Sequence, residues 1–134
     1  MSSNPNAPLT VLVIAPGIAP TLSVVDDPTL DFWQGIVDGY IEPISPADSD
    51  SGAWGAFCDE EGKIKGKPLN IAATAFADVI GWMGLAWGDA LVGTVVFCGA
   101  ADHDGHTLGL PDLTIEHAQA FFGDALIDAR GVTA

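Results

Sequence analysis

The chain has 134 residues, with four Lys or Arg against eighteen Asp or Glu, which gives a formal net charge of -14 at pH 7. Hydrophobic residues make up 49% and charged residues 16%, a balance that excludes a disordered acidic tail and predicts one folded domain. Such a charge repels phosphates and anionic lipid, so we expect no direct binding to nucleic acid or membrane. The acidity is either a functional surface or a property of an Asp-, Ala- and Gly-rich composition.

The sequence of the N-terminus and the pattern of the cysteines indicate the cellular compartment. The first residues, MSSNPNAP, lack the basic and apolar regions of a secretory signal. The longest weakly charged stretch, Ile71 to Trp87, is too short and too interrupted to span a membrane. Cys58 and Cys98 lie in apolar runs without metal-ligand spacing, which predicts buried, inert thiols. We therefore expect a reduced, cytoplasmic protein.

The first half of the domain shows two strands and a helix. Leu9 to Ala15 is a β-branched apolar run that ends at Pro16-Gly17, typical of a buried central strand. Ile18 to Val25 predicts a second short strand, interrupted by Pro20. A helix then follows, with Asp27 as its N-cap, Pro28 at its first position and Gly39 at its end. Its apolar face contains Leu30, Trp33, Ile36, Val37 and Tyr40.

A β-hairpin is predicted in the middle of the chain. After extended chain from Tyr40 to Ile44 and a surface loop from Ser45 to Gly52, alternation predicts a strand over Ala53 to Cys58. Asp59-Glu60-Glu61-Gly62 supplies a turn, and Lys63-Ile64-Lys65 predicts the returning strand with Ile64 inward. Its lysines, together with Lys67, either protect an edge strand from self-pairing or bind a partner.

The second half predicts helix, strand and helix. Asn70 is the candidate cap of a helix from Ile71 toward Leu85, although its glycines make that element ambiguous. Ala90 to Gly99 predicts a strand beside the first one in the centre of the sheet. Thr114 is the expected cap of a last helix, whose predicted buried face is Ile115, Ala118, Phe121 and Phe122.

These elements predict an α+β fold. We expect a flexible segment over residues 1–8, a single domain over 9–127 and a C-terminal tail over 128–134. The domain should contain a mostly antiparallel sheet with two or three helices packed on one face.

Two groups of side chains are candidate sites. Asp102, Asp104 and His106 alternate in the loop DHDGH and could supply two carboxylates and an imidazole to a divalent cation, or they could form a solvated turn. Trp82, Met83 and Trp87 could form an exposed patch that contacts a protein, or they could lie in the core, where Trp33 and Trp54 are expected. No catalytic residue and no cofactor is indicated, since the chain has no Gly-rich phosphate loop and Arg130 is its one arginine. An enzyme is therefore the weaker expectation.

Four blocks of the sequence, GYIEPI, CDEEGKIKGKPLN, GDALVGTVVFCG and LTIEHAQAFF, resemble successive blocks of the family named domain of unknown function 3846. The resemblance spans roughly Val11 to Phe122 and includes the strand that ends in Pro-Gly. The Ile71 to Trp87 block differs, because it is longer and contains tryptophans. Such proteins are encoded largely by bacteriophages and mobile elements, so the resemblance implies a bacterial host cell.

We expect a phage or mobile-element accessory protein that acts without catalysis, by binding a host or phage protein or another copy of itself. In a sharper version, its carboxylates mimic a phosphate backbone and inhibit a basic host protein. The alternative is a small-molecule or metal-binding domain.

Overall fold

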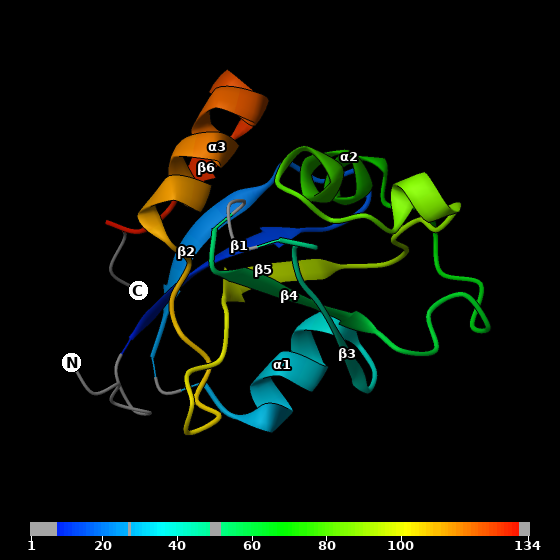
Figure 1. The fold of residues 1–134 in the computed structure, drawn as a ribbon, viewed down its shortest axis with the longest axis horizontal. Coiled ribbons are helices and arrows are strands. Elements are labelled where there is room, and N and C mark those ends of the chain that lie inside the picture. Colours follow the sequence, from blue (N-terminus) through cyan, green and yellow to red (C-terminus); the bar gives the residue numbers. More distant parts are fainter. Residues whose placement is uncertain (1–7, 27, 49–51, 132–134) are drawn as a thin grey trace.

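The computed structural model describes residues 8–26, 28–48 and 52–131. Within these residues one sheet has six strands in the order β3-β4-β5-β1-β2-β6 (Figure 1). Every neighbouring pair is antiparallel except β2 and β6, which confirms the mostly antiparallel α+β prediction. In chain order the strands are β1 (Leu9–Ile14), β2 (Thr21–Val25), β3 (Ile41–Ile44), β4 (Trp54–Asp59), β5 (Val95–Gly99) and β6 (Ile127–Asp128). The helices are α1 (Leu30–Val37), α2 (Ile71–Val79) and α3 (Asp112–Phe122), with short 3-10 turns η2 (Leu85–Trp87) and η3 (Gly123–Ala125).

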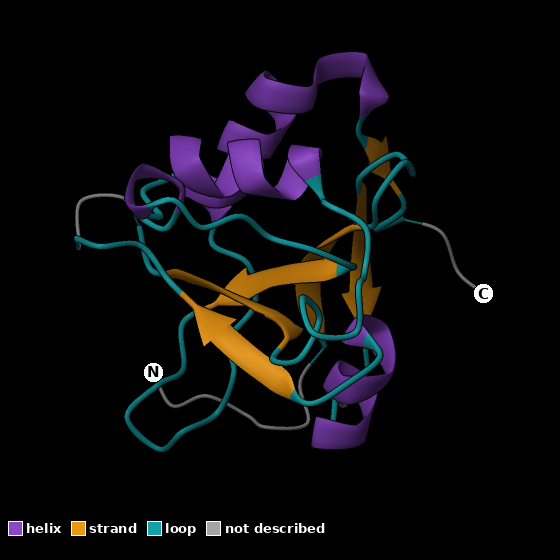
Figure 2. Ribbon diagram, turned by 90° about the vertical axis from the view of Figure 1, so that its right-hand side faces the viewer, coloured by secondary structure: helices purple, strands orange, loops and turns teal. Residues whose placement is uncertain are grey.

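Helices cover both faces of the sheet (Figures 1 and 2). Strand β5 shows why, because its side chains alternate between two cores: Val95 and Phe97 face one, Val96 and Cys98 the other. The first core is closed by α2 and α3, which share one face as predicted. Helix α1 closes the second core, so the prediction of a single helix-bearing face does not hold for α1. Since both faces of its central strands are apolar, the sheet needs a cover on each side.

Helix α1 begins and ends one or two residues away from its predicted limits. Thr29 is its N-cap, accepting a hydrogen bond from the backbone N–H of Phe32 at 3.2 Å. The predicted cap, Asp27, lies outside the described residues. At the other end Asp38, not Gly39, takes the left-handed conformation, with φ of 57°. Trp33 is buried as expected, on the face of α1 that meets the sheet.

The predicted hairpin after β4 is wrong. Residues 60–66 form consecutive turns instead of a returning strand, and Ile64 is 85% exposed rather than inward. The edge strand that the lysines were expected to protect therefore does not exist there. The edge of this part of the sheet is β3, which carries the exposed Glu42 and Pro43, two residue types that discourage pairing with another chain.

Asn70 caps α2, as predicted, and also joins three elements. Its side chain accepts from Ala73 N at 3.0 Å and donates to Ile14 O and Gly93 O, both at 2.8 Å. These bonds satisfy a fully buried amide and fix the start of α2 against β1 and the segment before β5.

Glycines make two elements in the second half of the chain, α2 and β5, shorter than predicted. Helix α2 ends at Val79, well before Leu85, because Gly81 takes a φ of 109° that leaves the helical region. Strand β5 begins at Val95 rather than Ala90, after Gly93 with a φ of 69°. The β-branched composition predicted the strand correctly but not its start.

The last helix starts two residues before its predicted cap. Because the helix begins at Asp112, Thr114 lies inside α3 and does not cap it. Thr114 is also fully buried. Ile115 and Ala118 are buried as expected, whereas Phe121 is 41% exposed. After α3 the chain adds β6 parallel to β2, a pairing that the sequence pattern did not predict.

Candidate functional site

The loop Glu60–Lys67, here called the lysine loop, turns its three lysines toward carboxylates. Lys63 pairs with Asp89, and Lys65 and Lys67 both pair with Asp59. The fourth basic side chain of the protein, Arg130, pairs with Asp128 at 2.7 Å. Every Lys and Arg therefore has an acidic partner, and the remaining carboxylates determine the sign of the surface.

Lys67 ties the lysine loop to the C-terminus of α1. Its ammonium donates to Val37 O at 2.7 Å, Asp38 O at 2.8 Å and Asp59 Oδ2 at 2.7 Å. An ammonium has three donors, so all of them are used, and two bind the carbonyls at the negative end of the helix dipole. Asp59, Lys65 and Lys67 are called the lysine cluster below.

Asp59 is the buried centre of the lysine cluster. Burial alone would raise its pKa, but hydrogen bonds from Lys67, Lys65 and the backbone N–H of Glu61 outweigh burial and hold the pKa well below its usual range. Gly39 leaves room for this carboxylate, since a Cβ on Gly39 would overlap it. The Gly39 of the predicted helix end is thus required by packing rather than by a positive φ.

A groove borders β3. One wall is the strand and the segment after it, and the other is the chain from Trp82 to Asp89; together they enclose about 560 Å³. The two walls are joined at Ala47, whose N–H donates to Gly81 O at 3.0 Å. This groove is lined by Glu42, Pro43, Ile44, Ser45, Pro46, Ala47, Trp82, Met83, Gly84, Trp87 and Asp89.

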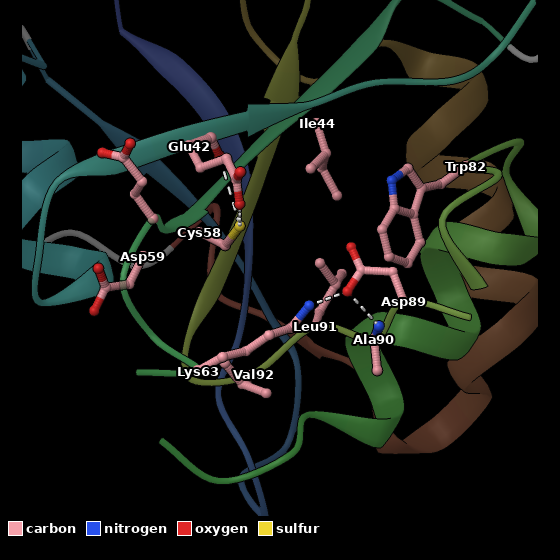
Figure 3. A pocket seen from close by; sticks show the side chains of 11 residues that line it. Glu42, Ile44, Cys58, Asp59, Lys63, Trp82, Asp89, Ala90, Leu91 and Val92 are labelled. Carbon is pink, nitrogen blue, oxygen red and sulfur yellow. Dashed lines mark hydrogen bonds and ion pairs between the residues drawn. The ribbon is translucent and has the colours of Figure 1, made fainter. Parts of the chain in front are cut away.

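A smaller pocket of about 190 Å³ adjoins the groove and shares Glu42, Ile44, Trp82 and Asp89 with it. Figure 3 shows Glu42 and Cys58 on one side of this pocket and Trp82 and Asp89 on the other. We call it the Glu42–Asp89 pocket.

The charge of the Glu42–Asp89 pocket is negative. Glu42 and Glu60 line it, and within the described part of the chain neither carboxylate forms an ion pair. Lys63 balances Asp89, and its hydrogen bond lowers the pKa of that carboxyl. Asp59 also borders the pocket, but its carboxylate points away from it (Figure 3) and pairs with Lys65 and Lys67.

Both cysteines are buried free thiols, as predicted. The Cys58 thiol donates to Glu42 O at 3.6 Å and to Glu42 Oε1 at 3.7 Å. Burial, followed by the charge of Glu42, raises the pKa of Cys58 to about 12, and burial raises the pKa of Cys98 to about 12. Neither thiol has the lowered pKa of a nucleophile.

The tryptophan candidates separate into core and surface. Trp82 is buried, with 8% exposure, whereas Met83 is 40% and Trp87 is 80% exposed. The Trp82 ring lies directly over Gly84, where a Cβ would overlap it. Trp33 and Trp54 are buried as expected, and Trp54 Nε1 donates to Ile80 O at 2.7 Å.

The DHDGH loop brings its three candidate ligands together. One ligand atom from each of Asp102, Asp104 and His106 lies within 4.8 Å of the others. The same loop is also a hydrogen-bonded turn, because Asp102 Oδ1 accepts from Asp104 N and His106 N, both at 2.9 Å. A turn accounts for this arrangement, and the geometry would also suit a cation.

Sequence reasoning missed Glu42 and Asp89 as members of a site. Each stands in a quoted block, GYIEPI and GDALVGTVVFCG, between residues that specify strands and turns. For Glu42, an acidic residue within a short strand was the available signal. Only the fold places these two carboxylates across one pocket.

The model of the family described as Domain of unknown function (DUF3846) matches residues 9–123. No curated protein and no solved structure matches the chain. Among the described residues, no helix has the length and apolar character needed to cross a membrane.

Proposed function

The chain belongs to the DUF3846 family, and from its groove we propose that it is a non-enzymatic phage or mobile-element accessory protein that binds a basic partner protein. The observation that carries the proposal is the Trp87 side chain, 80% exposed at the rim of an acidic groove. Met83, 40% exposed, lines the same groove, and aromatic and Met residues are enriched at interface centres.

Charge defines the partner. Each Lys and Arg side chain is already paired with an Asp, so the net charge of -14 acts outward through carboxylates. A basic protein of the bacterial host, such as one that binds DNA, is attracted by this field. In that case the acidic surface competes with DNA for the same partner and inhibits it.

The test is affinity capture from a bacterial host lysate with matched variants. Trp87→Ala removes the exposed aromatic of the groove, and Tyr40→Ala removes an aromatic, 65% exposed, that does not line it. We expect a basic protein that wild type and Tyr40→Ala retain, that Trp87→Ala loses, and that DNA and high salt displace. Equal capture by all three proteins, or salt-insensitive binding, would contradict the proposal.

A second candidate function is cation binding by the DHDGH loop, favoured by the 4.8 Å convergence of Asp102, Asp104 and His106. Calorimetric titration with MnCl₂ or ZnCl₂ and thermal melting of His106→Ala test it. Saturable one-to-one binding, lost in the variant, would support this function. Absence of binding, with equal melting of both proteins in divalent ions, would rule it out.

A further inference from the structure

The Glu42–Asp89 pocket has the size of one side chain. Its volume of about 190 Å³ lies below the range of roughly 300–1,000 Å³ that is typical of drug-sized ligands and cofactors. It is also not isolated, since it shares four residues with the groove. A polypeptide lying in the groove can therefore place one side chain into the pocket.

The charges of the pocket select a cation. Glu42 and Glu60 contribute negative charge, while Asp89 is balanced by Lys63. Burial is the main cause of the raised pKa of Cys58, and the negative charge of the nearby Glu42 carboxylate raises it further. An acidic or phosphorylated side chain would meet repulsion, whereas a basic one would meet the carboxylates of Glu42 and Asp89 on opposite sides (Figure 3).

Lys63 competes for this position. Its pairing with Asp89 is a surface ion pair, with 61% and 47% of the two side chains exposed, so its strength is small. An incoming basic group can take its place beside Asp89. The Trp82 ring in the wall favours a guanidinium over an ammonium, because a planar guanidinium stacks on aromatic surfaces.

We propose that the Glu42–Asp89 pocket receives an arginine side chain of the partner while the adjoining residues of the same segment pack in the groove against Met83 and Trp87. This inference rests on the proposed function and specifies it further. The ligand is a linear segment with a basic and an apolar residue. Charge complementarity selects the first, and the exposed aromatic surface selects the second.

The test uses a yeast-displayed library of random linear peptides, selected on the full-length protein and measured by titration. We expect enriched peptides to carry Arg near an apolar residue. Glu42→Gln should weaken their binding about tenfold, the loss that corresponds to about 1.4 kcal/mol. Lys63→Ala should strengthen it about threefold, because the competing cation is gone.

Two control variants separate the pocket from the overall field. Glu116→Gln removes the same charge from an exposed position on α3, and Arg130→Ala removes a cation from another surface ion pair. Both should leave peptide affinity unchanged. Equal weakening of peptide binding by Glu42→Gln and Glu116→Gln would overturn the inference that the pocket binds the arginine.

The peptide experiment distinguishes an error in the arginine inference from an error in the proposed function. Peptides without a basic residue that still require Trp87 would overturn the arginine inference and leave the groove as the binding surface. Peptides insensitive to both Glu42→Gln and Trp87→Ala would overturn the arginine inference and the proposed function together.

Discussion

The lysine cluster and the groove both border the β3–β4 edge of the sheet, but their carboxylates differ in burial and pairing. The Asp59 side chain is 1% exposed and has two lysine partners, whereas Glu42 is exposed and contacts a neutral thiol. Adjacent residues of β4 serve the two regions, with Cys58 at the pocket and Asp59 in the cluster. Removing a partner from a buried charge such as Asp59 destabilises the fold, while an exposed carboxylate in the groove that Trp87 also lines remains accessible from solvent.

The largest expected loss of stability comes from a substitution that breaks the lysine cluster. Lys67→Met should lower the free energy of unfolding by about 3 kcal/mol, because it removes three hydrogen bonds of one ammonium, to Asp59, Val37 O and Asp38 O, and leaves Asp59 with Lys65 and the Glu61 N–H. In the groove, Trp87→Ala should change the free energy of unfolding by less than about 0.5 kcal/mol, as is usual at an exposed site. Urea denaturation of both variants measures the difference, and equal losses would contradict the distinction between the two regions.

A glycine comparison gives the next effect. Gly39→Ala should destabilise the protein by about 2 kcal/mol, since the new Cβ overlaps the Asp59 carboxylate. Gly35→Ala, inside α1 with open space around the position of its new Cβ, should stabilise it by up to about 1 kcal/mol through helix propensity. Thermal melting checks both variants. A neutral Gly39→Ala would show that Asp59 can move without cost.

Acidification should weaken the lysine cluster in a defined window. The folded pKa of Asp59 is depressed, so its stabilisation is fully present above the unfolded pKa of about 3.9 and is lost as pH falls below that value toward the folded pKa. Melting temperatures between pH 6 and pH 2, in steps of about half a unit, should fall less steeply for Asp59→Asn than for wild type. Trp87→Ala should follow the wild-type curve. Identical slopes for Asp59→Asn and wild type would remove Asp59 as the cause.

The smallest expected effect concerns the thiols. With pKa values raised to about 12 and both side chains buried, Cys58 and Cys98 should resist iodoacetamide at neutral pH in the folded protein. Mass spectrometry should find two modifications after denaturation in urea and almost none before it. Rapid native modification of Cys58 would show that the Glu42–Asp89 pocket opens more widely than its structure indicates.

Local sequence patterns predicted the central strands and the cap of α2. They failed where residues far apart in the sequence determine the conformation of a segment. The apolar runs of β1 and β5 predicted their pairing in the sheet centre, and Asn70 was identified as the cap of α2. Lys63-Ile64-Lys65 in the lysine loop was predicted as a strand, because three residues that alternate between charged and apolar occur in turns as well as in strands. Its conformation depends on Asp59 and on the carbonyls at the end of α1, which no local pattern contains.

The candidate sites were predicted in part. Exposure of Met83 and Trp87 agrees with one of the two alternatives left open, whereas Trp82 belongs to the core. Periodicity could not separate them, because α2 ends at Val79, before Gly81 with its positive φ, and Trp87 belongs to the separate 3-10 turn η2. Glu42 and Asp89 were not identified, since they stand in separate blocks of the sequence and nothing in either block indicates a shared pocket.

The sequence by itself determined the α+β class, the buried thiols, the central strands and the acidic charge, because these follow from composition and from the side-chain period of each segment. Only the tertiary structure decided which acids are paired with a cation and which are exposed without an ion pair. The reason is that a carboxylate's role depends on the cations and surfaces brought near it by folding, and the four cations of this chain lie beside Asp38, Asp59, Asp89 and Asp128.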